Sequence, residues 1–378
     1  MSRLEHASEV ANLAAELGLG GAPVNAILRH CRTRIDRWVA EAGGVTTIGE
    51  LETVVTQRLQ MVFVEVRSNA DFDRITEKYA RGKKDPVFAS MRFRFDDAEN
   101  PTFGTLVKRK NVGDDAPDRF VAVIDCRGGK LARRFFTRWH EIAHRLTTHA
   151  DQGATEPAYR SEHDPLERMM DEIAGHVGFY GPFFDPAFDA AHGGKALLTF
   201  GTVEAVRAGG FPEASFQATL NACVKRMPTP VMCLEAALAY KKEERRRHQT
   251  PSLFGEAPPP GELRAIKVIP NPAAQQEGFT IPTNMRVPAA SVIRRLFDAD
   301  HQAGGDALED LSQWESRGKT LEQRPVAVEG RKLADRVIAI VQPVAGRAHK
   351  PLDRRSSPLF SVVEDDPGES GVRAEGGQ

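Results

Sequence analysis

The His-Glu-Ile-Ala-His sequence at 140–144 constrains this chain more than any other stretch, because it places two imidazoles and a carboxylate within five residues. Apolar residues recur at three- and four-residue intervals across 135–146, which predicts a half-buried helix. On a helix, His140 and His144 lie one turn apart on the same face, so both can bind a single Zn²⁺. Glu141 then lies beside the metal, where its carboxylate can act as the base for a bound water.

Two histidines leave such a site one protein ligand short, since catalytic zinc sites use three and keep the fourth position for water. A third histidine at the HExxHxxGxxH spacing is missing, because Ala150 stands ten residues after His140 and Thr147 stands where the glycine is expected. We interpret the nearby His149 as a helix-end cation or a loop residue. The third ligand must therefore come from elsewhere in the chain.

The best source of that ligand is the stretch 164–177. Asp164 followed by Pro165 predicts a helix start, with an N-cap side chain and proline at the first helical position. The helix carries one apolar stripe, which consists of Leu166, Met169, Met170, Ile173 and Val177. Glu167 lies at the margin of this stripe, and Asp171 lies one turn further along the same side. We predict that Glu167 is the third ligand and that Asp171 orients a ligand histidine.

Two alternatives to this assignment remain open. Glu167 could instead complete a capping box with Asp164, since Asp-x-x-Glu resembles that motif. Its combination with His140 and His144 upstream favours the ligand role. Glu172 is the reserve ligand, although it is expected on the more solvated side of the helix.

The two segments together resemble the ImmA/IrrE family of metallopeptidases over roughly residues 50–190. The family pattern is HExxH followed by a segment like E-x-x-x-N-x-F-A-A-x-L-L-M-P, which the run Glu-Arg-Met-Met-Asp-Glu-Ile-Ala-Gly at 167–175 resembles. Glu167 matches the acidic ligand of the family, Asp171 stands where asparagine is usual, and 178–180 replace the apolar run that ends in proline. The resemblance implies a zinc peptidase with a narrow substrate, often a DNA-binding repressor cut in a stress response or mobile-element switch.

The neighbouring segments predict an α+β protein with a zincin-like metallopeptidase domain, in which a small antiparallel or mixed sheet packs on the HExxH helix and a second ligand helix. Two helices are expected over 7–42, strands over 59–66, 86–95 and 119–125, a helix over 71–81, and an irregular or hairpin segment over 96–118. One sheet edge can hold an extended peptide beside the metal by strand addition. The break at 181–186 is expected to form a wall near the metal.

Beyond the site, helices are expected over 215–224 and 230–240, and prolines mark a linker. Helices over 288–300 and 307–314 and strands over 326–328 and 337–341 follow. The expected organisation is an N-terminal helical segment 1–50, the peptidase domain 51–247, a Pro-rich linker 248–280, a C-terminal α+β unit 281–350 and a disordered tail 351–378. For the C-terminal unit we expect regulation, partner binding or dimerisation, because it contains no chemical motif.

Charge and cysteine usage exclude some classes of partner. Lys and Arg total 51 against 52 Asp and Glu, a formal net charge of −1 that argues against direct nucleic-acid binding. We interpret the arginines of 29–37 as a solvated helix surface. Four cysteines without CxxC spacing predict free buried thiols, namely Cys31, Cys126, Cys223 and Cys233. No membrane-spanning run or signal peptide is found, so we expect a cytoplasmic protein without a membrane partner.

The sequence therefore predicts a zinc-dependent endopeptidase with one Zn²⁺ per chain, although Mn²⁺ or Fe²⁺ suit the same ligands. The expected partner is a specific intracellular protein substrate, which the resemblance suggests is a transcriptional repressor. Tyr159, His163 and His176 are equal candidates for stabilising the oxyanion. The alternative is a regulatory interaction protein whose peptidase-like domain binds a partner without cleaving it.

Overall fold

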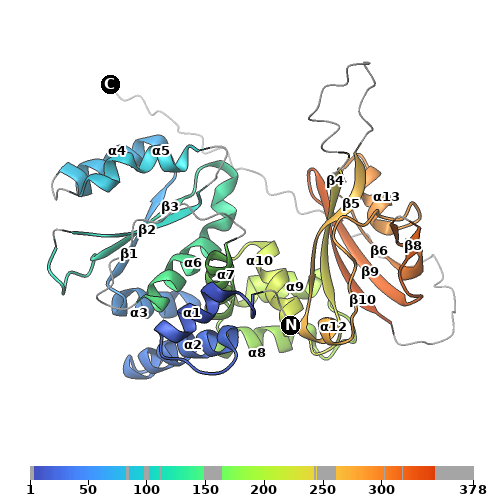
Figure 1. Cartoon of the computed structure of the whole chain (residues 1–378), viewed down its shortest axis with the longest axis horizontal. Helices are drawn as coiled ribbons and strands as arrows, with labels where there is room; N and C mark the ends of the chain where they lie inside the picture. The colour runs from blue at the N-terminus through green and yellow to red at the C-terminus, as the bar shows by residue number, and fades with distance from the viewer. Residues whose placement is uncertain are drawn as a thin grey trace, which may run out of the picture. The chain divides into compact units, whose positions relative to one another are not determined.

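The computed structural model describes residues 4–81, 85–97, 102–110, 112–148, 164–241, 244, 261–301, 303–316 and 318–344. Within these residues the chain is a mixed α+β protein that contains a three-stranded and a five-stranded sheet (Figure 1). None of the helices in these ranges is both long and apolar enough to cross a membrane. The tail predicted as disordered, 351–378, lies outside the described residues.

The N-terminal segment forms the two helices predicted over 7–42, followed by a third. They are α1 (Ser8–Glu16), α2 (Pro23–Glu41) and α3 (Ile48–Arg58). Helix α2 begins with its proline and buries Ile27, Cys31 and Ile35 at four-residue spacing, as an amphipathic helix must. Helix α3 is capped by the Thr47 hydroxyl, which accepts a hydrogen bond from the Glu50 amide at 3.2 Å.

The three-stranded sheet has the order β1-β3-β2. Strands β1 (Met61–Val66) and β3 (Phe120–Asp125) pair in parallel, and β2 (Gly104–Lys108) pairs antiparallel with β3. The sheet is therefore mixed, and the strands predicted over 59–66 and 119–125 are confirmed. The segment 96–118 contains β2 and makes the hairpin with β3, which was one of its two expected forms.

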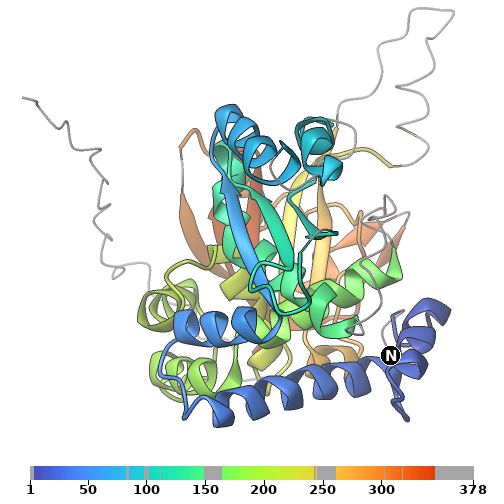
Figure 2. The ribbon, with the colours of Figure 1, turned by 90° about the vertical axis from the view of Figure 1, so that its left-hand side faces the viewer.

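Every residue of the central strand β3 is buried, because both faces of the sheet are covered. One face packs on α4 (Asn69–Ile75), the π-helical turn η1 (Thr76–Arg81), the 3₁₀ helix η2 (Pro86–Ser90) and α5 (Met91–Phe95). The other face packs on α6 (Arg134–Thr147), which follows the 3₁₀ turn η3 (Gly128–Arg133). Figure 2 shows α4 and α5 on one side of this sheet and the long helix α2 on the other.

The strand predicted over 86–95 is wrong, because this stretch forms η2 and α5. Its buried residues are Phe88, Met91 and Phe95, whose spacings of three and four match a helix, whereas Phe93 is 79% exposed. The alternation of Phe93 and Phe95 with arginines imitated a strand pattern. The helix predicted over 71–81 is present as α4 continued by η1.

Four helices lie between the HExxH helix and the strand that begins at Met232 in the described part of the chain. They are α7 (Pro165–Gly178), α8 (Gly181–His192), α9 (Phe200–Gly210) and α10 (Phe216–Arg226). The helix predicted over 215–224 is confirmed as α10, with Ser215 as its N-cap. The chain breaks between α7 and α8 as expected, and the segment 181–186 forms the first half of α8.

The five-stranded sheet is antiparallel and has the order β5-β4-β10-β9-β6. Its strands are β4 (Met232–Ala239), β5 (Glu262–Pro270), β6 (Gly304–Asp310), β9 (Pro325–Lys332) and β10 (Arg336–Pro343). The connections contain α12 (Pro272–Gln276), α13 (Val292–Asp298), the 3₁₀ turn η4 (Leu311–Gln313) and the short strands β7 (Glu315–Ser316) and β8 (Lys319–Thr320). The predicted strands over 326–328 and 337–341 and the predicted helix over 288–300 are confirmed as β9, β10 and α13.

Two predicted α-helices in this region are wrong, because the first stretch is a strand and the second is a strand followed by a 3₁₀ turn. The apolar run over 230–240 forms β4, which is buried between two clusters of side chains and pairs with strands on both sides. The stretch 307–314 forms most of β6 and η4, with exposed and half-buried residues alternating along the edge of the sheet. A continuous apolar run fits a buried strand as well as a buried helix, so periodicity alone does not separate them.

Strand β5 lies within the stretch 248–280 that was predicted as a linker, so the linker prediction is wrong from Glu262 onward. The five-stranded sheet also takes β4 from the segment assigned to the peptidase domain. Residues 248–260 lie outside the described part of the chain. All four cysteines are free and buried, as predicted.

Candidate metal centre

The HExxH motif lies on α6, whose apolar side anchors it in the largest cluster of buried side chains. Trp139, Ile142 and Leu146 are fully buried there. His140 and His144 point away from this cluster and keep 18% and 32% of their side chains exposed. The helix therefore holds the two imidazoles at a partly open surface while its other side is fixed.

Helix α7 runs against α6 and brings a carboxylate to the two histidines. A Cβ atom at Gly178 would lie 2.9 Å from Cδ1 of Trp139, so glycine is what allows this close approach. The helix begins where the sequence predicted, with the Asp164 carboxylate accepting a hydrogen bond from the Leu166 amide at 2.8 Å. Asp164 thus caps the helix through its side chain, and the Glu167 carboxylate contacts the two histidines.

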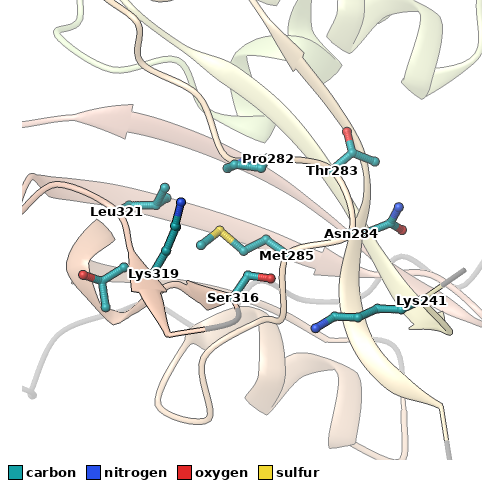
Figure 3. Close-up of a pocket in the computed structure, with 9 residues that line it drawn as sticks. Lys241, Pro282, Thr283, Asn284, Met285, Ser316, Lys319 and Leu321 are labelled. Atoms are coloured by element: carbon teal, nitrogen blue, oxygen red, sulfur yellow. The ribbon is translucent and has the colours of Figure 1, made fainter. Parts of the chain in front are cut away.

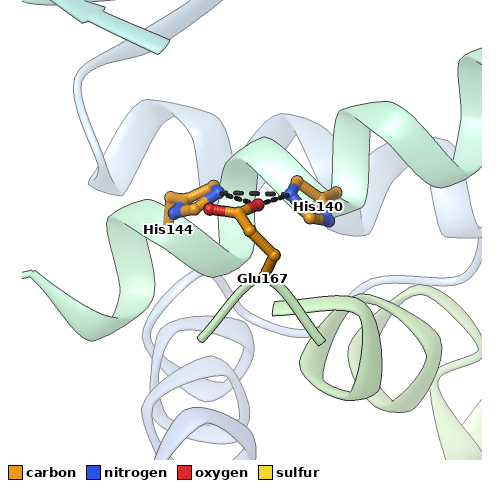
Figure 4. A group of neighbouring side chains, drawn as sticks. All are labelled: His140, His144 and Glu167. Atoms are coloured by element: carbon orange, nitrogen blue, oxygen red, sulfur yellow. Dashed lines mark hydrogen bonds and ion pairs between the residues drawn. The ribbon is translucent and has the colours of Figure 1, made fainter. Parts of the chain in front are cut away.

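The structure brings together His140, His144 and Glu167 (Figure 4). Oε2 of Glu167 lies 3.2 Å from Nε2 of His140 and 3.5 Å from Nε2 of His144, and the two Nε2 atoms are 3.1 Å apart. Three ligands at zinc bond lengths in a tetrahedral arrangement would be about 3.3 Å from one another. The donor set and its spacing therefore fit a divalent metal ion, with two imidazoles and one carboxylate as ligands.

Asp171 contacts the other ring nitrogen of His140. Its Oδ1 lies 2.8 Å from Nδ1 of His140, so the Nδ1–H can donate to it while Nε2 faces Glu167 and His144. A carboxylate in this position fixes the tautomer of a ligand histidine and raises its basicity. This is the place in the site that the sequence predicted for Asp171.

The electrostatics of the cluster favour positive charge. Burial lowers the pKa of His140, but hydrogen bonds to Asp171 and Glu167 outweigh it and raise the pKa to about 10. For Glu167 the two effects have the opposite signs. Burial raises the pKa of its carboxyl group, but hydrogen bonds to His140 and His144 outweigh burial and bring that pKa well below its usual range. A field that holds a proton on an imidazole this firmly also attracts a metal cation.

Glu141 lies next to these ligands in a more buried position, with only 4% of the residue exposed. Burial raises the pKa of its carboxyl group, while the neighbouring His144 and His140 oppose that shift. A carboxylate with a raised pKa suits a group that accepts a proton and later gives it back.

The sequence reasoning did not single out Gly104 of β2. A Cβ atom at this position would lie 2.5 Å from Oε1 of Glu141 and 2.6 Å from Cγ2 of Thr137, so the strand leaves room here for the Glu141 carboxylate. A glycine inside a strand often marks a close approach of another group, and that signal was present in the sequence.

The remaining candidates do not join the cluster. The carboxylate of the reserve ligand Glu172 lies 2.7 Å from Nζ of Lys225. Among the described residues, it does not belong to the group of side chains that could bind a metal ion. His176 lines a different cavity together with Arg29 of α2, and burial lowers its pKa. Tyr159 and His163, the other oxyanion candidates, lie outside the described residues, as does His149.

In comparison with known proteins, no protein-family model and no curated protein sequence matches the chain.

Proposed function

We propose that this chain is a metal-dependent endopeptidase of the ImmA/IrrE type with a zincin-like domain, and that it hydrolyses a specific intracellular protein. The observation that carries the proposal is the convergence of His140, His144 and Glu167 beside the buried carboxylate of Glu141. Zn²⁺ suits two imidazoles and a carboxylate best, and Mn²⁺ or Fe²⁺ use the same donors. The sequence resemblance to that family adds a DNA-binding repressor as the first substrate to test.

In this proposal the two histidines and Glu167 hold the ion, and Asp171 keeps the His140 ring in place through its Nδ1–H. A bound Zn²⁺ would polarise the scissile carbonyl and acidify a water molecule. Glu141 takes a proton from the attacking water and passes it to the nitrogen of the leaving amine. The raised pKa of Glu141 makes both transfers accessible to one carboxyl group.

The outer edge of β2, which pairs with no other strand among the described residues, offers a place for an extended substrate. The Phe103 carbonyl accepts from the Asp125 amide at 2.8 Å, and the Arg109 amide donates to the Arg119 carbonyl at 2.9 Å. Odd-numbered residues of this strand therefore pair with β3, and the backbone groups of Gly104 and Leu106 face the outer edge. A peptide added along that edge would pass Gly104, which is in contact distance of Glu141.

The test compares protein fragments from cells that produce the wild-type chain or the Glu141→Gln variant, with metal analysis of both purified proteins. We expect a small set of new N-termini that depends on Glu141, and about one metal ion per wild-type chain. Identical fragments from the two strains, with metal bound to both proteins, would instead favour a protein that binds its partner without cleaving it. Absence of stoichiometric metal would contradict the proposed site itself.

Replacing Asp171 should weaken metal binding without abolishing it. Asp171→Ala removes the acceptor from Nδ1 of His140, and loss of such a partner costs about 10–100-fold in metal affinity. Asp171→Asn keeps an oxygen acceptor and should lose less. Competition with a chromogenic chelator measures both variants. Glu172→Ala is the matched control, because that carboxylate contacts Lys225 and should leave the affinity unchanged.

Adding one methyl group at Gly104 should reduce activity while the metal stays bound. Gly104→Ala places a Cβ atom 2.5 Å from Oε1 of Glu141, which is closer than non-bonded contact allows, so the carboxylate must move. Displacing a catalytic group by about 1 Å can cost about 100-fold in rate. Peptidase rate and metal content are measured side by side. Gly113→Ala is the control, because nothing lies within 4 Å of a Cβ there, and equal rates for the two variants would contradict the placement of Glu141.

A further inference from the structure

A second candidate site lies in the part of the chain that contains the five-stranded sheet. A cavity of about 510 Å³ opens between Lys241 at the end of β4, the turn over 282–285 and the β7–β8 hairpin (Figure 3). Its size falls within the range of small-molecule sites, which is roughly 300–1,000 Å³. Figure 3 shows the side chains of Lys241 and Lys319 entering from different elements, on either side of Met285.

The lining of this cavity is cationic and rich in hydrogen-bond donors. Besides the two lysines, Thr283, Ser316 and Thr320 line it, and no carboxylate is among its lining residues in the described part of the chain. Neither Lys241 nor Lys319 forms a salt bridge through its ammonium group with a residue that the structure describes. Two ammonium groups on one concave surface without a carboxylate partner repel each other and attract an anion.

Two carboxylates near Lys241 and the turn over 282–285, those of Glu262 and Glu244, are engaged with other groups. Glu262 contacts Arg264 at 3.1 Å and also Arg286. Glu244 contacts Arg264 at 3.5 Å, and its other oxygen accepts from the backbone amide of Lys241 at 2.6 Å. Glu262 and Glu244 are therefore paired with arginines and with a backbone amide, and neither of them lines the cavity.

The turn over 282–285, which forms one wall of the cavity, is held in place by hydrogen bonds to its backbone. Asn284 adopts a left-handed backbone conformation with φ 67°, which asparagine tolerates in a tight turn. Its amide donates to the Ala265 carbonyl at 2.7 Å, and its own carbonyl accepts from the buried guanidinium of Arg264 at 3.2 Å. The Met285 amide closes the turn on the Pro282 carbonyl at 3.1 Å. A wall held by these bonds needs little ordering when a ligand binds.

The lining also indicates the class of anion. Lysine binds phosphate as a point charge, and its three N–H donors can be shared among the phosphate oxygens. Among the described residues, the lining of the cavity contains two lysines together with three residues that carry hydroxyl groups. A phosphate ion alone would not fill it, and Met285 and Leu321 provide apolar surface for a larger body.

We propose that this cavity binds a small organic phosphate, with the phosphate group between Lys241 and Lys319 and the organic part against Met285 and Leu321. This cavity shares no residue with the metal centre. The sequence showed no chemical motif in the C-terminal unit, and this cavity gives that part of the chain a small-molecule site.

Pyridoxal 5′-phosphate is a suitable probe, because it carries a phosphate and an aldehyde. In the full-length protein one lysine would hold the phosphate while the other condenses with the aldehyde, losing water, and borohydride then reduces the imine to a stable amine. Mass spectrometry measures the labelling rate of each lysine. We expect Lys241 or Lys319 to be labelled at least about tenfold faster than the exposed Lys195, with protection by inorganic phosphate.

Several outcomes would overturn the inference. Labelling of Lys241 and Lys319 at the rate of Lys195 would show that they are ordinary solvated lysines. Equal labelling by pyridoxal, which lacks the phosphate, would exclude phosphate recognition, and equal protection by acetate would indicate a carboxylate site instead. Lys319→Gln should slow labelling of Lys241, whereas Lys195→Gln should not. The His144→Ala variant should be labelled like wild type, which separates this site from the proposed peptidase function.

Discussion

Glu141→Gln is expected to reduce the rate of peptide hydrolysis by about 10²–10⁴-fold while the bound metal is retained. The reason is that glutamine has the shape of glutamate but cannot accept a proton from the attacking water. The three ligand side chains are unchanged, and the buried position of residue 141 beside Gly104 accommodates either side chain.

This effect is measured with a cleaved protein identified from cellular fragments, or with a peptide that spans its cleavage site. Glu172→Gln is the matched control, since it makes the same chemical change in a carboxylate that contacts Lys225. A Glu141→Gln protein with near wild-type activity would exclude Glu141 as the base. Loss of metal together with activity would show that residue 141 supports the ligands rather than the proton transfer.

His144→Ala and Glu167→Ala should each remove most of the metal from the purified protein. Both side chains contribute a donor atom to a group whose members lie within 4.8 Å of one another. Loss of an indirect partner already costs about 10–100-fold in metal affinity, so loss of a direct ligand should cost more than about 100-fold. Elemental analysis after dialysis, followed by chelator competition, gives the stoichiometry and the affinity.

The control for these variants is His6→Ala, because His6 is an exposed histidine ahead of α1. The comparison between Glu167→Ala and Glu172→Ala also decides the third ligand directly. If metal is lost only with Glu172→Ala, the assignment of Glu167 is wrong. Retention of one metal per chain in both His144→Ala and Glu167→Ala would place the ion outside this cluster.

The candidate site was largely predictable because its signals are local. His140 and His144 are related by one helical turn, and the Asp164-Pro165 pair determines where α7 begins. From that start, the position of Glu167 on the helix follows from 100° per residue. What the sequence could not show is how closely α7 approaches α6, since that depends on Gly178 meeting the Trp139 ring.

The errors in the fold arose where distant partners determine the local structure. The run Met-Cys-Leu-Glu-Ala-Ala-Leu-Ala at 232–239 suits a helix by composition, yet it is a strand because β5 and β10 pair with it on both sides. Strand β10 follows about a hundred residues later, so a local pattern contains no information about it. The same applies to β6, whose partner β9 sets its conformation.

Strand β4 and strand β10 have a consequence for the way the chain unfolds. Alternate residues of these strands belong to different buried clusters: Leu234 and Ala339 lie in one, whereas Cys233 and Ile340 lie in the cluster that also holds the HExxH helix. Unfolding of the sheet would therefore remove buried side chains from both clusters at once. We expect the two clusters to unfold together in a single cooperative transition. A fragment that stops at Lys241 would keep β4 without either neighbour and expose its apolar edge, so it should aggregate rather than fold as a minimal peptidase.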